Sequence, residues 1–521
     1  MLRNSWLRVG LTGIKNLKLA AGSEVEVKAG PLYQKKVYRG VPLLFGMRAI
    51  PQADTVRITW PNGLIQNEVK QLVAKRYEYK EAQRLSGSCP VIWTWNGSEF
   101  EYITDVLGVA PLGASSGDGQ YFPTDHDEYI AISGDSLRSR AGKLEVRITE
   151  ELSEVTYLDR VQLIAVDHPA STAVYANEKW KAPPFPEFRL YGTPDPKHPI
   201  RATDERGKDV TELVARKDRR YPDSFPQNLN GVAAMHSLEL DFGDVARDNR
   251  AVLILNGWVD WADGSTFLAQ SQESAAGLQP PKLQVKDSSG AWVTVIDDMG
   301  MPDGKPKTIT VDLTGKFLSR SRAVRIVTNL CVFWDEIFLS EDSGAPEAQL
   351  TSLAPVSADL HFRGFSHTVI HPERRQPEQF LYAMPAATSL WNPTPGLYTR
   401  YGAVQSLLAD ADDRLMIMGS GDEVKMLFDE SRLPAPKTGW RRDYLLKVEG
   451  WAKDRDANTA FSQSVEPLPF RAMSRYPYPP GESYPSTPTL DDYRRQYNTR
   501  PALRLIRPLT LTGTQSKGVH P

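Results

Sequence analysis

Apolar and polar residues alternate along many short stretches of the chain. A period of two predicts strands that bury one face and expose the other, as in antiparallel sheets. The alternating stretches lie at residues 24–27, 144–148, 238–242, 283–285, 308–311 and 324–327. Turn pairs such as Asn62-Gly63 and Asn96-Gly97 separate stretches of this kind. The pattern predicts a mainly β, multi-domain chain of antiparallel β-sandwiches or jelly rolls.

Patterns that favour helices are few. The clearest is near the end of the sequence, where Thr489 offers a capping hydroxyl and Asp491 and Asp492 would lie in the first turn. This helix is expected to end at about Tyr497, shortly before Pro501. We therefore expect short helices as minor elements.

Polar and proline-rich stretches mark the expected domain boundaries. A length of 521 residues predicts roughly three or four domains, and breaks fall at residues 82–88, 182–199 and 341–350. The expected units are a β module at 1–82, a β-rich domain at 83–181, a β-sandwich at 182–345 and a second, related sandwich at 346–521. The last unit contains a Pro/Tyr-rich segment, 466–488, which fits neither a central strand nor a helix interior.

One motif occurs twice. Residues 253–258 read LILNGW and residues 446–451 read LKVEGW, and in both copies an Asp and a Thr follow at the same offsets. Each copy predicts a strand that ends in Gly-Trp and continues into a polar loop. This indicates that the two predicted sandwiches are related, and a chance match over a short window is the alternative.

Composition narrows the classes of function. The formal net charge is −2, from 62 basic and 64 acidic residues, and no basic patch of the kind that binds nucleic acid is visible. No apolar stretch is long enough to cross a membrane. Arg3, Arg8, Lys15 and Lys18 interrupt the N-terminal apolar residues, so this chain shows no signal peptide.

Two cysteines, Cys89 and Cys331, make neither a disulfide framework nor a zinc site. They lie 242 positions apart, so either a disulfide between them or two buried thiols fits the sequence. The oligomeric state is likewise open.

The first module carries a family resemblance. Residues 4–9, Gly13 with Asn16, residues 22–27 and above all Val56-Arg57-Ile58-Thr59-Trp60-Pro61-Asn62-Gly63 resemble the ASPIC/UnbV module, although Gly22-Ser23 stands where that family usually has Gly-Ala. The family usually follows an FG-GAP propeller in secreted bacterial proteins. The resemblance implies a C-terminal part of a longer extracytoplasmic protein (periplasmic, cell-surface or secreted) and supplies no catalytic residues. Residues 230–340 also resemble a galactose-binding-type jelly roll.

The polar loops after the duplicated motif are the first candidate sites. Asp454, Asp456 and Asn458 place oxygen atoms at alternate positions, a pattern that suits calcium. An Asx-rich turn is the alternative. The candidates for stacking on a sugar ring are Trp258, Trp261 and Trp451. Asp263 is a further candidate ligand contact. A core role is the alternative for the tryptophans.

Four further clusters are weaker candidates. Asp125-His126-Asp127-Glu128 suits metal binding or acid–base chemistry, and also a solvated loop. His361, His367 and His371 would share one face of a strand. Residues 113–117 fit G-x-S-x-G but lack the strand and helix of a nucleophile elbow. Asp335-Glu336 would point to opposite faces of a strand, so a second carboxylate would be needed.

The leading hypothesis is a non-catalytic, extracytoplasmic binding or structural protein whose partner is a glycan or another protein. One alternative is a carbohydrate-active enzyme that uses carboxylates from residues 125–128 and 335–336. Another is an accessory subunit of a larger assembly. Calcium is the one cofactor that the sequence suggests.

Overall fold

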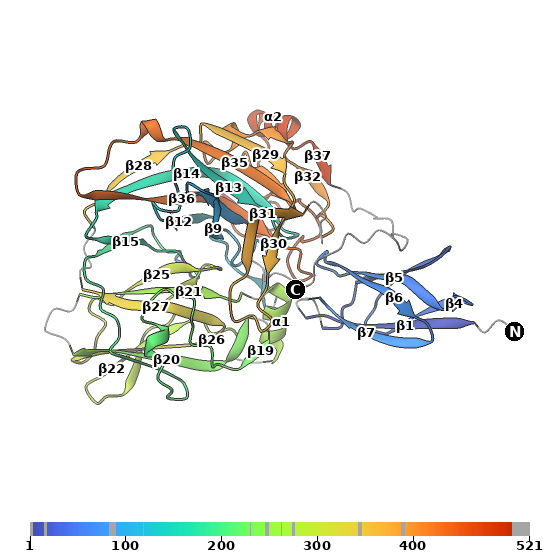
Figure 1. Cartoon of the computed structure of the whole chain (residues 1–521), viewed down its shortest axis with the longest axis horizontal. Helices are drawn as coiled ribbons and strands as arrows, with labels where there is room; N and C mark the ends of the chain where they lie inside the picture. Colours follow the sequence, from blue (N-terminus) through green and yellow to red (C-terminus); the bar gives the residue numbers. More distant parts are fainter. Residues whose placement is uncertain are drawn as a thin grey trace.

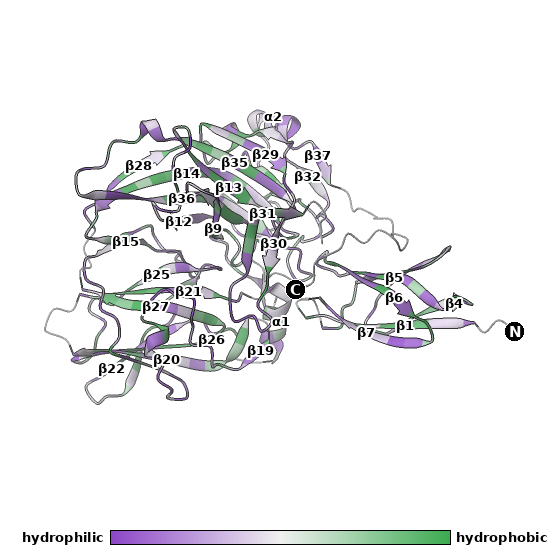
Figure 2. Ribbon diagram, in the orientation of Figure 1, coloured by the Kyte–Doolittle hydropathy of each residue, from purple (hydrophilic) through white to green (hydrophobic). Residues whose placement is uncertain are grey.

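The computed structural model describes residues 4–14, 18–82, 90–117, 119–229, 231–244, 250–261, 263–273, 277–341, 346–386 and 391–502. The chain is mainly β, as predicted, and forms a small module beside two larger bodies of stacked sheets (Figure 1). Hydrophobic residues recur along the strands of these bodies (Figure 2). Among the described residues, no helix is long and apolar enough to cross a membrane.

Residues 5–80 form the first module from two sheets. Its strands, in sheet order, are β4 (Leu43–Arg48), β1 (Ser5–Thr12) and β7 (Lys75–Lys80), then β3 (Leu32–Val37), β2 (Glu24–Ala29), β5 (Gln52–Thr59) and β6 (Ile65–Leu72). Among the described strands of this module, β1 and β7 are the one pair that runs parallel. The turn at Gly63 contacts the next sandwich, because Gly63 O accepts a hydrogen bond from Asn392 N at 2.9 Å. Gly63 has a φ of +87°, and an added Cβ would lie 2.7 Å from Arg455.

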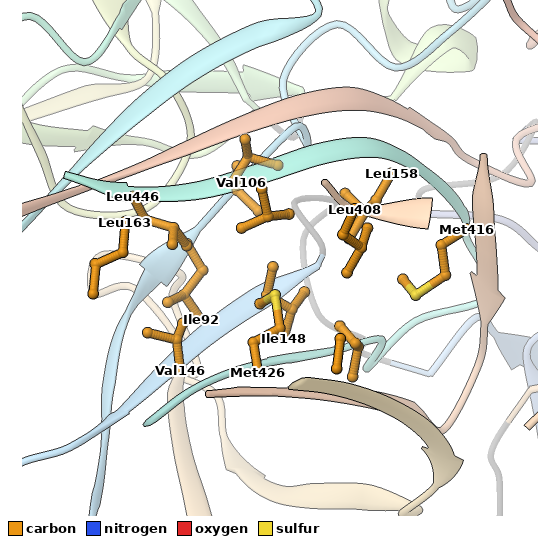
Figure 3. Packing of buried hydrophobic residues seen from close by; sticks show 14 of the residues in the cluster. Ile92, Val106, Val146, Ile148, Leu158, Leu163, Leu408, Met416, Met426 and Leu446 are labelled. Carbon is orange, nitrogen blue, oxygen red and sulfur yellow. The ribbon is translucent and has the colours of Figure 1, made fainter. Parts of the chain in front are cut away.

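The first sandwich packs two sheets face to face. One contains β12 (Asp127–Ile132), β36 (Trp440–Lys453), β14 (Val155–Pro169) and β28 (Gln349–Leu353), with β34 (Met416–Gly419) on β14. The other contains β33 (Gly402–Ala403), β29 (Ser357–Phe362), β35 (Asp422–Asp429), β13 (Lys143–Thr149), β8 (Val91–Trp95) and β9 (Phe100–Asp105). Leu163 and Leu446 of one sheet face Val146, Ile148 and Met426 of the other, and their side chains form the core (Figure 3).

The second sandwich has the same design. One sheet contains β25 (Lys307–Asp312), β21 (Val252–Val259) and β27 (Val332–Ser340). The other contains β18 (Arg201–Asp204), β20 (Val232–Asp244), β26 (Ser321–Leu330), β22 (Lys282–Lys286) and β23 (Trp292–Ile296), with β19 (Gln227–Leu229) on β20.

Short elements connect these sheets. The strand pairs are β10 (Ser115–Gly117) with β11 (Gln120–Tyr121), β15 (Ala173–Ala176) with β17 (Leu190–Thr193), β16 (Lys179–Trp180) with β24 (Met301–Pro302), β30 (Phe365–Val369) with β31 (Gln379–Ala386), and β32 (Gly396–Tyr398) with β37 (Arg500–Ala502). The helices are α1 (Gly264–Glu273), α2 (Pro488–Tyr497) and the 3-10 turns η1 (Thr211–Leu213), η2 (Gln405–Leu407) and η3 (Glu430–Arg432). The expected last helix is α2, but its cap is Thr487, with Pro488 at the first helical position, and not Thr489.

The sheets join segments that the sequence assigned to separate domains. Strands β12, β13 and β14 of the predicted domain 83–181 pair with β35 and β36 of the predicted domain 346–521. These two segments therefore share one core, and residues 182–345 are inserted between them. The correction has a simple cause, since alternation shows which face of a strand is buried but not which strand lies beside it.

The chain passes twice through one order of strands. The first run is β8, β9, β12, β13, β14, β18, β20, β21, and the second is β22, β23, β25, β26, β27, β29, β35, β36. The three-stranded core β12-β36-β14 matches β25-β21-β27, and β29-β35-β13-β8-β9 matches β18-β20-β26-β22-β23. The first half of each run is thus completed by the second half of the other, and the duplicated Gly-Trp motif occupies the equivalent central strands β21 and β36.

Equivalent local contacts support this match. Asp159 in β14 and Asp335 in β27 each accept hydrogen bonds from two successive backbone N–H groups of a turn. The donors are Asp412 and Asp413 at 3.0 and 2.9 Å in one sandwich, and Asp218 and Arg219 at 3.0 and 3.1 Å in the other. The second donor of each turn has a positive φ, 65° and 62° respectively. The two sandwiches therefore share details that the strand order alone does not require.

Candidate binding cleft

The three candidate tryptophans are all buried. Trp258 and Trp261 are 1% and 3% exposed. Trp258 stacks on Phe333 with ring centroids 4.5 Å apart, and Trp261 packs against Phe122, Trp180 and Phe267. Other aromatic side chains pack against both rings. Trp258 and Trp261 are therefore core residues, which was the alternative interpretation of the sequence.

Trp451 is also 1% exposed and packs in a buried cluster with Tyr157 and Tyr398. It is, in addition, one of the residues that line a cleft of about 560 Å³. Three segments make the walls: residues 119–126, Pro183 with Phe185, and residues 470–477. Tyr121 stands at the cleft and is 41% exposed. The aromatic side chains that line the cleft are Tyr121, Phe122, Phe185, Trp451, Phe470 and Tyr476.

The two copies of the Gly-Trp motif differ at this point. Trp258 packs with Tyr221, Phe225 and Phe333 in one buried cluster. Trp451 also packs in a buried cluster, but residues of the segment 470–477 line a cleft beside it. The cleft beside Trp451 is therefore a candidate binding site next to a structural tryptophan.

The cleft carries positive charge. Its charged or titratable lining residues are Arg471, Arg475 and His126, and no carboxylate lines it in the described part of the chain. Arg471 lies 3.7 Å from Glu449 Oε1 and 3.8 Å from an Asp159 oxygen. Arg475 is exposed and has neither an ion pair nor a hydrogen bond with another described residue. A guanidinium without a protein partner beside aromatic rings suits an anionic ligand.

Residues 125–128 separate this cleft from a second cavity. His126 Nδ1 lies 3.4 Å from Asp127 Oδ1, and this contact raises the pKa of His126 above its usual value. Burial opposes ionisation of Asp127, but hydrogen bonding to His126 holds the pKa of Asp127 well below its usual range. Burial, together with the charge of Asp303, raises the pKa of Asp125 to about 6. Neighbouring carboxyl groups therefore ionise at different pH.

The predicted calcium loop takes part in a contact between the sandwiches. Asp456 Oδ1 and Oδ2 accept hydrogen bonds from Ser265 Oγ at 2.8 and 2.7 Å, and Asp456 Oδ1 also accepts one from Asn458 N at 2.8 Å. Burial and the charges of Asp263 and Asp454 raise the pKa of Asp456 well above its usual value. The loop thus brings Asp263 close to Asp456, its equivalent in the duplicated motif.

Calcium at Asp454, Asp456 and Asn458 stays a prediction. In the ranges that the structure covers, no group of three or more His, Cys, Asp or Glu side chains is arranged to hold a metal ion. Asp263, a candidate ligand contact, caps α1, because its Oδ1 accepts hydrogen bonds from Thr266 N and Oγ1 at 3.1 and 3.0 Å. Its contact with a ligand stays a prediction.

The structure does not bring the other predicted partners together. Asp335 accepts hydrogen bonds from the backbone of a turn, and Glu336 lies 3.0 Å from His198. Neither residue lines the two cavities beside residues 125–128, so the carboxyl groups of the two predicted clusters do not meet in these cavities. His361 contacts Asp359 and Glu423. Residues 115–117 form β10, a short strand. Cys331 is a buried free thiol, and Cys89 lies outside the described residues.

Sequence reasoning missed the walls of the cleft. Phe185 lies in the proline-rich stretch 182–199, which was interpreted as a connection, and residues 470–477 lie in the Pro/Tyr-rich segment 466–488, which was placed in the second predicted sandwich but not at a site. Their aromatic residues were the available signal, because a purely solvated linker has little use for buried rings such as Phe470 and Tyr476.

Comparisons with known proteins assign the chain to no family. No protein-family model matches the chain, and no curated protein or solved structure gives a significant match.

Proposed function

We propose that the chain is a binding protein that holds an acidic carbohydrate in the cleft beside Trp451. The observation that carries the proposal is a cleft of about 560 Å³ lined by six aromatic side chains and by Arg471, Arg475 and His126. Aromatic faces suit the apolar faces of sugar rings. Guanidinium groups pair with carboxylates through parallel hydrogen bonds.

The framework of the cleft favours binding over a role in packing alone. Trp451 itself is buried, so the accessible surface of the cleft comes from the segments around it. Phe185 and Tyr121 both line the cleft and are accessible in part, which leaves aromatic surface for a saccharide.

Replacement of Arg475 by alanine should weaken binding of an acidic oligosaccharide at least about tenfold, since a hydrogen bond to a charged group contributes about 1.5–3 kcal/mol. The probe is trigalacturonic acid, measured by isothermal titration calorimetry after a glycan-array screen. Arg475 makes no contact that the fold needs, so folding should be unchanged.

Arg250→Ala is the matched control, because Arg250 is exposed and lies outside the cleft. Neutral cellotriose should bind more weakly than trigalacturonic acid. Equal affinity of wild type and Arg475→Ala for the acidic probe, or no binding of any array glycan, would reject the proposed site.

Acid–base hydrolysis of a glycoside is the second candidate function. The observation that favours it is the pair of carboxyl groups beside the cleft, Asp125 with a pKa of about 6 and Asp127 with a pKa well below its usual range. A proton donor and an ionised carboxylate in different environments are what such chemistry needs. Release of nitrophenol from 4-nitrophenyl glycosides, lost in Asp125→Asn, would support this function, and no turnover would leave the binding role.

The pKa of Asp125 can be tested directly. In a carbon-13 NMR titration of the carboxyl groups, Asp125 should titrate near pH 6. Asp303→Asn should lower this midpoint, because the charge of Asp303 raises the pKa of Asp125. Asp287→Asn, on a distant hairpin, should leave it unchanged. A midpoint near 4 in the wild type would show that Asp125 is solvated like an ordinary aspartate.

We also propose an extracytoplasmic location, which rests only on the resemblance of residues 1–82 to the ASPIC/UnbV module. Cell fractionation of the native host with an antibody against the chain tests it, and recovery in the cytoplasm alone would contradict it.

A further inference from the structure

A second cavity, of about 230 Å³, lies between the two sandwiches. Its walls come from β12 of the first sandwich, from β25 and Asp303 of the second, and from residues 177–179 and 186–188. Glu178 joins the two bodies, because its carboxylate accepts hydrogen bonds from Ala131 N in β12 at 2.9 Å and from Thr308 N in β25 at 3.0 Å. The cavity is thus held by fixed backbone on both sides.

Negative charge exceeds positive charge around this cavity. The only lysines in its lining are Lys179 and Lys307, and both are engaged. Lys179 Nζ donates to Thr310 O at 2.9 Å, and Lys307 Nζ lies 3.1 Å from Asp105 Oδ1 and donates to Asp303 O. The carboxyl side chains of the lining are Asp125, Asp127, Glu128, Glu178, Glu187 and Asp303.

Among the described residues, three of these carboxyl groups have a buried oxygen without a hydrogen-bond donor, namely Asp127 Oδ1, Glu128 Oε2 and Asp303 Oδ1. His126 Nδ1 lies 3.4 Å from Asp127 Oδ1. Within the described ranges, no N–H or O–H group lies within hydrogen-bond distance of Glu128 Oε2 or Asp303 Oδ1. Asp303 is 5% exposed, and the side chain of Glu128 is 10% exposed. Lys307 Nζ is 3.7 Å from Glu128 Oε2, too far for a hydrogen bond. Glu128 and Asp303 lie within hydrogen-bonding reach of each other. Burial, together with the charge of Asp303, raises the pKa of Glu128 well above its usual value, so one shared proton bonds the pair.

An ammonium group in the cavity would take the place of this shared proton, because it donates hydrogen bonds in several directions and carries the positive charge that two ionised carboxylates favour. We propose that the cavity binds a primary ammonium group on a short alkyl chain, with Glu128 Oε2 and Asp303 Oδ1 as acceptors. Its source is either a free diamine or the side chain of a lysine in a polypeptide. The proposal is independent of the carbohydrate cleft.

The shape and lining of the cavity favour an organic cation. The carboxylates are not grouped closely enough to hold a metal ion in the part of the chain described, whereas an ammonium donates hydrogen bonds in several directions. Tyr129 and Phe188 line the same cavity, and their rings stack with centroids 4.2 Å apart. This apolar wall suits the methylene groups of an alkyl chain.

Calorimetric titration of the full chain at constant ionic strength tests the proposal with three probes. These are 1,4-diaminobutane, Nα-acetyl-lysine amide and tetramethylammonium. We expect saturable binding of one or both primary amines, with the tighter of them identifying the source. We expect no saturable binding of tetramethylammonium, which is a cation but has no N–H donor.

Asp303→Asn and Glu128→Gln should each weaken amine binding at least tenfold, and Glu212→Gln, on an exposed turn, should not change it. Near-UV circular dichroism checks that each variant folds. If Asp303→Asn does not fold, Glu128→Gln decides, and the comparison of primary with quaternary ammonium on the wild type needs no variant. The proposal is overturned if the folded wild type binds neither amine, if tetramethylammonium binds as tightly, or if affinity survives in a folded Asp303→Asn or Glu128→Gln.

Discussion

Replacement of Lys307 by methionine should lower the free energy of unfolding by about 3–5 kcal/mol, the usual cost of removing one partner from a buried ion pair. Lys307 is 2% exposed and lies at the junction of the two sandwiches. Its Nζ is 3.1 Å from Asp105 Oδ1 and 3.7 Å from Glu128 Oε2. Burial disfavours the ammonium, yet the charges of Asp105, Glu128 and Asp303 raise the pKa of Lys307 above its usual value. Methionine would leave these carboxyl groups buried without their cation.

Urea denaturation at pH 7 measures this loss. Lys143→Met is the matched control, since Lys143 lies 3.1 Å from Asp429 at the surface, with 37% of its side chain exposed. An exposed pair of this kind contributes about 0–1 kcal/mol. Equal effects of the two substitutions would mean that Lys307 does not stabilise the junction through its charge.

The alternation of apolar and polar residues predicted the strands well. Residues 144–148 lie in β13, 308–311 in β25 and 324–327 in β26, because a strand with one buried face must carry this pattern wherever it pairs. The pattern could not predict that β14 pairs with β36 across nearly three hundred residues. That pairing depends on the complementary surfaces of the folded sheets, which no local window contains.

Helix α1 shows a second limit. Asp263, a predicted ligand contact, was placed in a polar loop, whereas the structure places it at the start of a helix that begins at Gly264; the ligand contact stays a prediction. The spacing Asp263-x-x-Thr266 was the available signal. Among the candidate site residues, Trp451 and members of the cluster 125–128 line cavities, and their roles stay predictions. The residues of the segment 470–477 that line the same cleft as Trp451 were not predicted as site residues. Which of their side chains line the cleft depends on how this proline-rich segment folds against the sandwich.

Replacement of Gly450 by alanine should lower the free energy of unfolding by about 3 kcal/mol, the upper end of the usual cost of overpacking. Gly450 lies in β36 opposite Leu158, next to the bulge in β14. A Cβ at this position would lie 2.2 Å from the backbone oxygen of Tyr157. Backbone on a central strand has little freedom to move, so the sheet must distort.

The equivalent glycine of the duplicated motif makes this prediction sharper. A Cβ on Gly257 would lie 2.6 Å from Phe333 O, so Gly257→Ala should also destabilise the protein, by about 2–3 kcal/mol. Gly46→Ala is the control, because a Cβ on Gly46 in β4 meets no atom within 4 Å, and it should change stability by less than about 0.5 kcal/mol. The comparison is made by thermal and urea denaturation. If Gly450→Ala and Gly257→Ala were as stable as Gly46→Ala, the prediction would be wrong. The close approach of the neighbouring strand at each bulge would then not explain why the motif has glycine at these positions.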